Sequence, residues 1–333
     1  MGAETKIEWC DYTFNPWRGC TKVDASCKHC YAETMSKRNP KVLGVWGDSG
    51  TRVIASESMW RQPVIWNHKA GCIAAATGVN IRPRVFCASM ADVFEDRADL
   101  VEPRKRLFDL IDATPNLYWL LLTKRPKNVK RMLVFDWWLR NPGKSLERII
   151  DENLVEPRPN VWLGTSVSDQ ESADKRIPEL LQVPAAVRFL SVEPLLGPVD
   201  LTHVPLPDGD RLGTGLFAHG DGCGIDWVIV GGESGGNARP CNVAWIRSIV
   251  AQCAAARFPC FVKQLGARPV GWCATQGDSD ADGHETDHCD AYEGSEISQP
   301  CPAGHCAMRV DRKGGDSAEW PDDLRVRQFP STA

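Results

Sequence analysis

The chain has 333 residues and a formal net charge of −4 at pH 7, which excludes a generally basic nucleic-acid coat protein. Its residues are 43% hydrophobic and 25% charged, so a largely disordered chain is also excluded. No apolar run approaches the roughly 20 residues of a membrane span, and residues 1–10 lack the pattern of a signal peptide. We therefore expect a cytoplasmic protein with no membrane partner.

Short apolar or β-branched runs are expected to be strands, at residues 12–19, 84–88, 117–122, 160–164, 187–190, 227–230 and 260–262. Several lack polar alternation, which is typical of strands buried on both faces of a parallel sheet. Segments 99–114 and 242–257 carry their apolar residues on one stripe and are expected to be helices. No Gly-x-Gly-x-x-Gly follows the first strand, which argues against a Rossmann sheet. The order predicts an α/β fold, a partial or closed TIM-like (β/α) barrel over residues 1–268.

Polar clusters follow six of these strands, at residues 89–92, 123–126, 165–168, 191–194, 231–234 and 263–264. In a (β/α) barrel the carboxyl ends of the strands form the active-site face. The alternative interpretation is that these are ordinary loop residues. The side chains in the clusters that can bind or react are Ser89, Asp92, Lys124, Arg125, Ser166, Glu193, Glu233 and Lys263.

Residues 269–333 are expected to form a C-terminal extension. Its insert, residues 271–308, has eight acidic residues and no Lys or Arg, and residues 311–330 read as an ordered segment that returns to the barrel. The insert also holds three histidines and four cysteines, namely Cys273, Cys289, Cys301 and Cys306. A zinc ion or an auxiliary iron–sulfur cluster would order so polar a loop, although free thiols are the simpler interpretation.

The most specific pattern is a cysteine motif directly after the first predicted strand. Cys20, Cys27 and Cys30 are spaced C-x6-C-x2-C. Three thiolates on one loop can hold three irons of a [4Fe–4S] cluster and leave the fourth iron open to a small molecule. A zinc site with His29 or Cys10 as the fourth ligand remains the alternative, as does a loop without metal.

This loop resembles the radical S-adenosylmethionine (SAM) superfamily, whose usual motif is C-x3-C-x2-C after strand one of a partial (β/α)6 barrel. The first gap here is six residues, as in divergent members. The chain more closely resembles a phage-associated family known as Gp thirty-seven/sixty-eight. The segments that carry this second resemblance are residues 7–9, 15–17, 20–31, 191–195, 231–235, 263–266, 311–316, 320–321 and 324–327.

The resemblance implies an enzyme that binds SAM at the open iron and cleaves it reductively to a 5′-deoxyadenosyl radical, which takes hydrogen from a substrate. It implies an electron donor such as flavodoxin or ferredoxin. Ser89, Asp92, Lys124, Ser166 and Glu193 are then the candidates for binding SAM. Glu193, Glu233 and Lys263 are the candidate catalytic residues. The resemblance names no substrate.

Two alternatives use other features of the sequence. Segment 123–148 carries eight Lys or Arg residues and two tryptophans, so it could bind nucleic acid, or it could be a solvated helix face. It suggests a nucleic acid or nucleotide as the substrate, or a zinc-dependent nucleic-acid-binding protein. A barrel hydrolase would instead use Glu193 and Glu233 as paired carboxylates.

Overall fold

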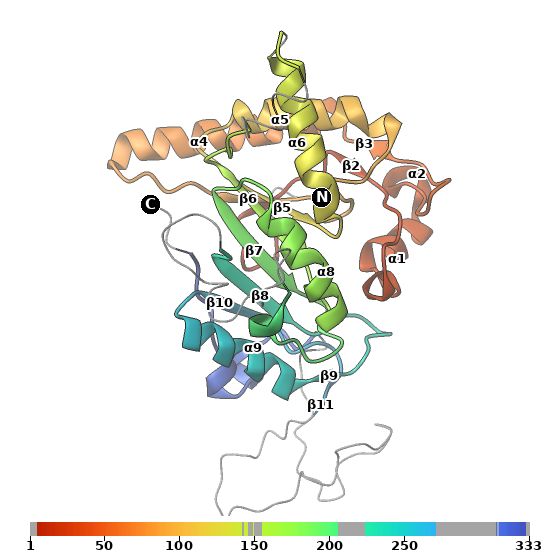
Figure 1. The fold of residues 1–333 in the computed structure, drawn as a ribbon, viewed down its shortest axis with the longest axis vertical. Helices are drawn as coiled ribbons and strands as arrows, with labels where there is room; N and C mark the ends of the chain where they lie inside the picture. The colour runs from red at the N-terminus through yellow and green to blue at the C-terminus, as the bar shows by residue number, and fades with distance from the viewer. Residues whose placement is uncertain are drawn as a thin grey trace, which may run out of the picture.

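The computed structural model describes residues 5–141, 143–145, 149, 155–205, 224–270, 311 and 313–330. Its centre is a parallel sheet whose strands follow one another in chain order (Figure 1). The strands are β1 (Tyr12–Thr13), β4 (Arg84–Cys87), β5 (Tyr118–Thr123), β6 (Val161–Ser166), β7 (Val187–Val192), β8 (Trp227–Gly231) and β10 (Cys260–Gln264). The predicted α/β class is confirmed. Within the described residues β1 and β10 stay at the two ends of the order, so the sheet is a half-barrel and not a closed barrel.

The main helices cover the outer side of this sheet (Figure 1). They are α3 (Glu57–Trp60), α4 (Gln62–Thr77), α5 (Val101–Asp112), α6 (Pro126–Arg140), α8 (Gln170–Leu181) and α9 (Val243–Ala256). Local signals fix where they begin: Pro126 occupies the first turn of α6, Asp169 and Ser172 form a capping box on α8, and Asn242 caps α9. The predicted helices 99–114 and 242–257 correspond to α5 and α9.

The remaining elements are short. They are α1 (Tyr31–Arg38), α2 (Pro40–Leu43), the antiparallel pair β2 (Trp17–Arg18) and β3 (Val53–Ile54), the parallel pair β9 (Cys241–Asn242) and β11 (Pro269–Val270), and the 3-10 turns Ala25–Cys27, Ala98–Leu100, Leu201–His203, Ser317–Glu319 and Asp322–Leu324. The predicted strand 12–19 is therefore wrong in its length, because β1 ends at Thr13. Asn15 turns the chain out of the sheet by accepting a hydrogen bond from Met90 N through its side chain, at 2.7 Å.

Aromatic rings fill the concave side of the half-barrel. Alternate residues of the strands point to this side, where Trp227 lies 6.0 Å from both Trp162 and Phe189, measured between ring centroids. Phe261 and Trp9 complete the ring cluster, each 6.3 Å from Trp227. All five side chains are buried, so the base of the half-barrel is closed to water.

Gly164 makes room for this aromatic cluster. It lies opposite Phe189 in the pairing of β6 with β7, and a Cβ at residue 164 would stand 2.4 Å from the Phe189 ring. We expect Gly164→Ala to lower the free energy of unfolding by about 1–3 kcal/mol, since a packed core cannot accept the added carbon without strain. Urea denaturation measures this change. Gly236→Ala, where the Cβ meets nothing within 4 Å, should have little effect, and equal losses in the two variants would refute the packing argument.

The C-terminal segment lies along the open edge of β10. Val262 N donates to Val326 O at 2.8 Å, and Gln328 N donates to Cys260 O at 2.9 Å. Arg327 forms an ion pair with Glu8 at 2.7 Å, and Phe329 packs on Trp227 with centroids 5.5 Å apart. Residues 326–329 therefore cover the free edge of β10 and the base of the ring cluster. The acidic insert 271–308, with its four cysteines, lies outside the described residues.

Candidate functional site

The cysteine loop, residues 19–31, begins at Gly19, where the backbone conformation and the lack of space both require glycine. Gly19 has a φ of +111°, and a Cβ there would stand 2.6 Å from Thr51 O, so a larger residue would strain the backbone. Gly19 N donates to Met90 O at 3.1 Å, which ties the start of the loop to the residues after β4. Asp24 caps the turn Ala25–Cys27 by accepting from Ser26 N at 2.8 Å. Cys20, Cys27 and Cys30 are all half-buried.

Side chains and carbonyls from several strand ends hold this loop. Tyr31 Oη donates to Ser89 O, after β4, at 2.6 Å. Arg239, in the segment after β8, donates from Nη1 to Ala25 O at 2.8 Å. Arg176 of α8 forms an ion pair with Asp24. The loop therefore lies across the carboxyl ends of the strands, and the structure brings the cysteines together with the polar clusters.

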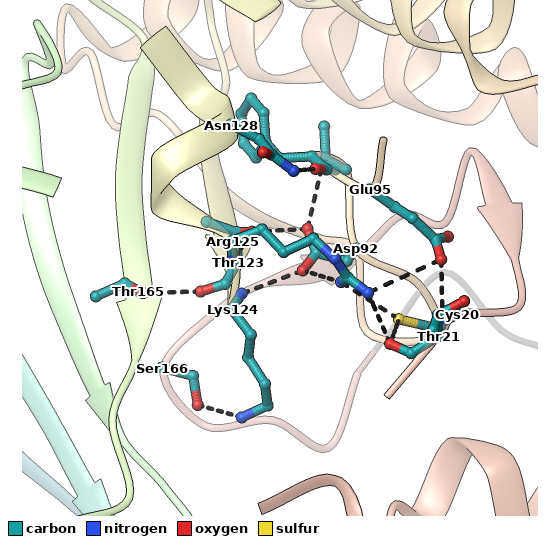
Figure 2. Close-up of polar contacts among 12 residues, drawn as sticks. Cys20, Thr21, Asp92, Glu95, Thr123, Lys124, Arg125, Asn128, Thr165 and Ser166 are labelled. Carbon is teal, nitrogen blue, oxygen red and sulfur yellow. Dashed lines mark hydrogen bonds and ion pairs between the residues drawn. The ribbon is translucent and has the colours of Figure 1, made fainter. Parts of the chain in front are cut away.

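Asp92 is saturated by donors of this chain (Figure 2). One of its oxygens accepts from Thr123 Oγ1 at 2.7 Å and from Phe94 N at 3.0 Å. The other accepts from Arg125 Nη1 at 2.8 Å and from Lys124 N at 3.1 Å. Because a carboxylate offers about four acceptor positions, these contacts fill Asp92 in the free chain and hold the Arg125 guanidinium. The geometry gives no support to the predicted role of Asp92 in binding SAM, and that role stays a prediction.

Arg125 joins the end of β5 to the cysteine loop, as Figure 2 shows. Its Nη1 donates to Cys20 Sγ at 3.8 Å, and its Nη2 donates to Thr21 O at 2.7 Å. Burial and the nearby Asp92 raise the pKa of the Cys20 thiol to about 12, although Arg125 opposes this shift. The thiol is therefore neutral at pH 7 in the free chain, and a bound metal would have to displace its proton.

A buried ion pair supports the same end of the loop. Arg52 and Glu95 lie 2.6 Å apart with side chains 1% and 4% exposed. Glu95 also accepts from Thr21 N at 3.0 Å, and Arg52 donates to Thr21 Oγ1 at 2.9 Å. Sequence reasoning missed both residues because they lie outside the strand-end clusters, in segments without a recognisable motif.

Lys124 and Ser166 face each other across β5 and β6. Lys124 Nζ donates to Ser166 Oγ at 2.6 Å, and Ser166 Oγ donates to Glu193 O at 3.0 Å. Burial lowers the pKa of the Lys124 ammonium. Within the part of the chain that the structure describes, this ammonium has no carboxylate partner within ion-pair distance. It is therefore the cation of the site that remains available to an anionic ligand.

Glu193 forms an ion pair with Lys263, whose Nζ lies 3.1 Å from Glu193 Oε1. Among the described residues, no donor has hydrogen-bond geometry to Oε1, which is buried. Gly231 leaves space for this carboxylate, since a Cβ there would lie 2.8 Å from Oε1. The pair thus offers one acceptor oxygen near Ser166, whereas the Lys263 ammonium is already paired with Glu193.

Glu233 is held by Arg239 through a forked contact, at 2.6 Å from Nη2 and 2.9 Å from Nε. His29 Nδ1 lies 3.4 Å from the same carboxylate. These hydrogen bonds and the charge of Arg239 outweigh burial and lower the pKa of Glu233. A glycosidase general acid needs a raised pKa, so this geometry gives no support to the predicted hydrolase. No sequence motif indicated Arg239, whose contact with the loop depends on the fold.

We expect Glu233→Gln to lower the free energy of unfolding at pH 7 by about 1–2 kcal/mol, a discounted value because Arg239 is partly exposed. The folded pKa of Glu233 is lowered, so its stabilisation is complete above the unfolded pKa of about 4.3 and is lost as the pH falls through the folded value. Melting temperatures at pH 7, 5 and 3.5 should show a constant difference between wild type and variant, then a narrowing one. The exposed Glu171→Gln is the control. A difference that widens at pH 3.5 would contradict the assignment.

Several basic side chains of segment 123–148 already have partners within the chain, so fewer of them are available to bind nucleic acid than the composition indicates. Arg125 faces the cysteine loop, Arg131 pairs with Asp96 at 2.7 Å, and Arg140 pairs with Asp136 at 3.0 Å. Lys144 lies over the Trp137 ring, 5.3 Å from its centroid. Nucleic-acid binding by this surface stays a prediction.

Thiols are suitable ligands for an iron–sulfur cluster, and the loop supplies three of them. In the residues that the structure describes, no group of three or more His, Cys, Asp or Glu side chains converges on a point where one metal ion could bind. Cysteines of a four-iron cluster bind separate irons, so they stand apart around it. The donor chemistry and the spacing along one half-buried loop fit a cluster. The predicted second site at Cys273, Cys289, Cys301 and Cys306 lies outside the described residues.

Comparisons with known proteins assign the chain to a family. A family model described as "Protein of unknown function (DUF5131)" matches residues 4–299. No curated protein and no solved structure matches the chain. No helix among the described residues is long and apolar enough to cross a membrane.

Proposed function

Because the chain belongs to the DUF5131 family, which has no assigned function, we propose an activity from the site itself: a radical SAM enzyme. Cys20, Cys27 and Cys30 would hold a [4Fe–4S] cluster with one open iron. The bound cluster would supply the electron that cleaves SAM reductively, and the resulting radical would take hydrogen from the substrate. Reduced flavodoxin or ferredoxin is the electron donor that we propose.

One observation carries the proposal. The cysteine loop lies across the carboxyl ends of the half-barrel strands, where Tyr31, Arg176 and Arg239 hold it. A half-barrel of parallel strands places its ligand-binding side chains at this edge. The cysteine loop and the polar residues at the ends of β5 to β10 therefore lie on the same edge of the sheet.

The chain's own residues can bind a zwitterionic ligand such as SAM. Among the described residues, no carboxylate lies within ion-pair distance of the Lys124 ammonium, which can therefore receive the ligand carboxylate. Glu193 Oε1 is a buried acceptor that no described residue supplies with a hydrogen bond, and it can receive an ammonium or a ribose hydroxyl. Ser166 and Lys263 orient these two groups through their contacts at 2.6 Å and 3.1 Å. Ser89 contributes its carbonyl to Tyr31, so we propose a positioning role for it.

The aromatic cluster on the concave side of the sheet supports the proposal in a second way. Trp162, Phe189 and Trp227 are buried and close the base of the half-barrel. A reactive intermediate formed at the carboxyl ends of the strands would be shielded from water on that side. The site residues do not identify the substrate, and a nucleic acid or nucleotide remains the proposal taken from segment 123–148.

Anaerobic reconstitution with iron and sulfide tests this function. We expect about four irons per chain, an electron paramagnetic resonance (EPR) signal after dithionite, a change in that signal on adding SAM, and formation of 5′-deoxyadenosine. Zinc bound in place of iron, with no EPR signal, would overturn the proposal and favour a zinc protein. An EPR signal that SAM leaves unchanged would retain the cluster and reject SAM as its ligand.

A further inference from the structure

Among the three motif cysteines, Cys20 has a distinct environment. Its Sγ accepts a hydrogen bond from Arg125 Nη1 at 3.8 Å, within the range for a sulfur acceptor. In the described part of the chain, no charged side chain donates to the sulfur of Cys27 or of Cys30. The three cysteines are therefore chemically unequal before any ligand binds.

The guanidinium of Arg125 is fixed in place. Asp92 accepts from the same Nη1 at 2.8 Å, and Thr21 O accepts from Nη2 at 2.7 Å. The Arg125 side chain is 12% exposed, and Asp92 is itself held by Thr123 Oγ1. A guanidinium held from two sides does not turn toward a substrate carboxylate or phosphate, so this geometry does not suit Arg125 as a substrate-binding residue.

We propose that Arg125 is a positioning residue that raises the reduction potential of a cluster bound through Cys20, with Asp92 fixing its guanidinium. This inference rests on the proposed function. Hydrogen bonds to the sulfurs and local charge are among the factors that set the potential of an iron–sulfur cluster. Reduction adds one electron and breaks no bond of the ligand set. An N–H donor at the sulfur stabilises the more negative, reduced form and so makes reduction easier.

Two carboxylates near Arg125 reduce the effect of its positive charge on the cluster, so the effect of its hydrogen bond to Cys20 can be considered separately. Asp92 lies 2.8 Å from the guanidinium and Glu95 lies 3.9 Å from it, so they offset much of its positive field. What remains is the directed N–H group at Cys20 Sγ. Lysine keeps a positive charge but lacks the rigid fork that reaches Asp92, Thr21 and Cys20 together.

The test is a redox titration of reconstituted wild type, Arg125→Gln, Arg125→Lys and the control Arg131→Gln, followed by the EPR amplitude of the reduced cluster. At a fixed potential we expect the ratio of reduced to oxidised cluster in Arg125→Gln to fall at least tenfold, which is about 59 mV for a one-electron couple. Arg125→Lys should shift in the same direction. Arg131→Gln removes an exposed arginine of α6, the helix that begins directly after Arg125, and should leave the midpoint unchanged.

A midpoint unchanged in both Arg125 variants, with iron content equal to wild type, would overturn the inference while leaving the proposed function intact. If Arg125→Gln fails to retain iron, Arg125→Lys decides by the same criterion. A shift of equal size in Arg131→Gln would show a general charge effect and would also overturn the inference. Wild-type protein that takes up no iron would remove the proposed function, and this inference with it.

Discussion

Replacement of Cys27 by alanine is expected to abolish formation of 5′-deoxyadenosine and to reduce the bound iron to a small fraction of the wild-type content. Two thiols would leave two irons of a four-iron cluster without a protein ligand, so we expect the cluster to be bound weakly or lost. Cys27 is the most informative of the three cysteines, because Cys30 packs against a hydrophobic cluster and Cys20 accepts a hydrogen bond from Arg125, whereas in the described part of the chain Cys27 does neither. The substitution should therefore leave the melting temperature nearly unchanged.

The matched control is Cys72→Ala. Cys72 is an exposed thiol on α4, outside the cysteine loop, so its loss should alter neither iron content nor product. Iron and 5′-deoxyadenosine are measured in parallel with thermal unfolding. If Cys27→Ala retained full iron and full product formation, the assignment of the cysteine loop would be wrong. Equal losses in the two variants would point to nonspecific iron binding by surface thiols.

Trp227→Ala is expected to give the largest loss of stability, about 3–5 kcal/mol in the free energy of unfolding. The indole is fully buried at the centre of the ring cluster, in contact with Trp162, Phe189 and Phe261. Its Nε1 donates to Gln328 O at 2.9 Å, so the substitution also loosens the C-terminal segment from β10. The loss combines buried apolar area with a cavity that the rigid strands cannot fill.

Urea denaturation followed by far-ultraviolet circular dichroism measures this loss. Trp138→Ala is the control, because the Trp138 side chain is only half-buried on α6 and packs on the exposed Phe135. We expect the control to lose less than half as much stability as Trp227→Ala. Similar losses would mean that the ring cluster does not dominate the core of the half-barrel.

The predictions for Cys27 and Trp227 concern two levels of the half-barrel, the site at the strand ends and the aromatic cluster below it. The lower part of the concave side is filled by aromatic rings, whereas the residues above it are small or polar, such as Ser166, Ser191 and Gly231. Strand residues of the same face alternate along β6, β7 and β8, so one register sets both layers. The core that stabilises the sheet therefore also fixes the position of the site.

The sequence by itself determined the strands and the cysteine motif. Parallel strands buried on both faces appear as short apolar runs, and six of the seven predicted runs overlap their observed strands closely. Helix α9 was predicted because its apolar residues form one stripe behind the cap Asn242. Helix α4 was not predicted, because its own apolar residues do not form one stripe. Trp66 is buried, whereas the apolar residues Val64 and Ile73 are exposed.

The tertiary structure alone decided which polar groups meet. Arg176 reaches Asp24 and Arg239 reaches Glu233 and Ala25, pairings that depend on how the loop lies over the strand ends. It also filled the acceptor positions of Asp92 with donors from Arg125 and its neighbours, contacts that no sequence pattern indicated. Periodicity in a sequence reports which residues are buried, because burial follows from local geometry. It carries no record of the partner of a buried charge, which is set by contacts between segments far apart in the chain.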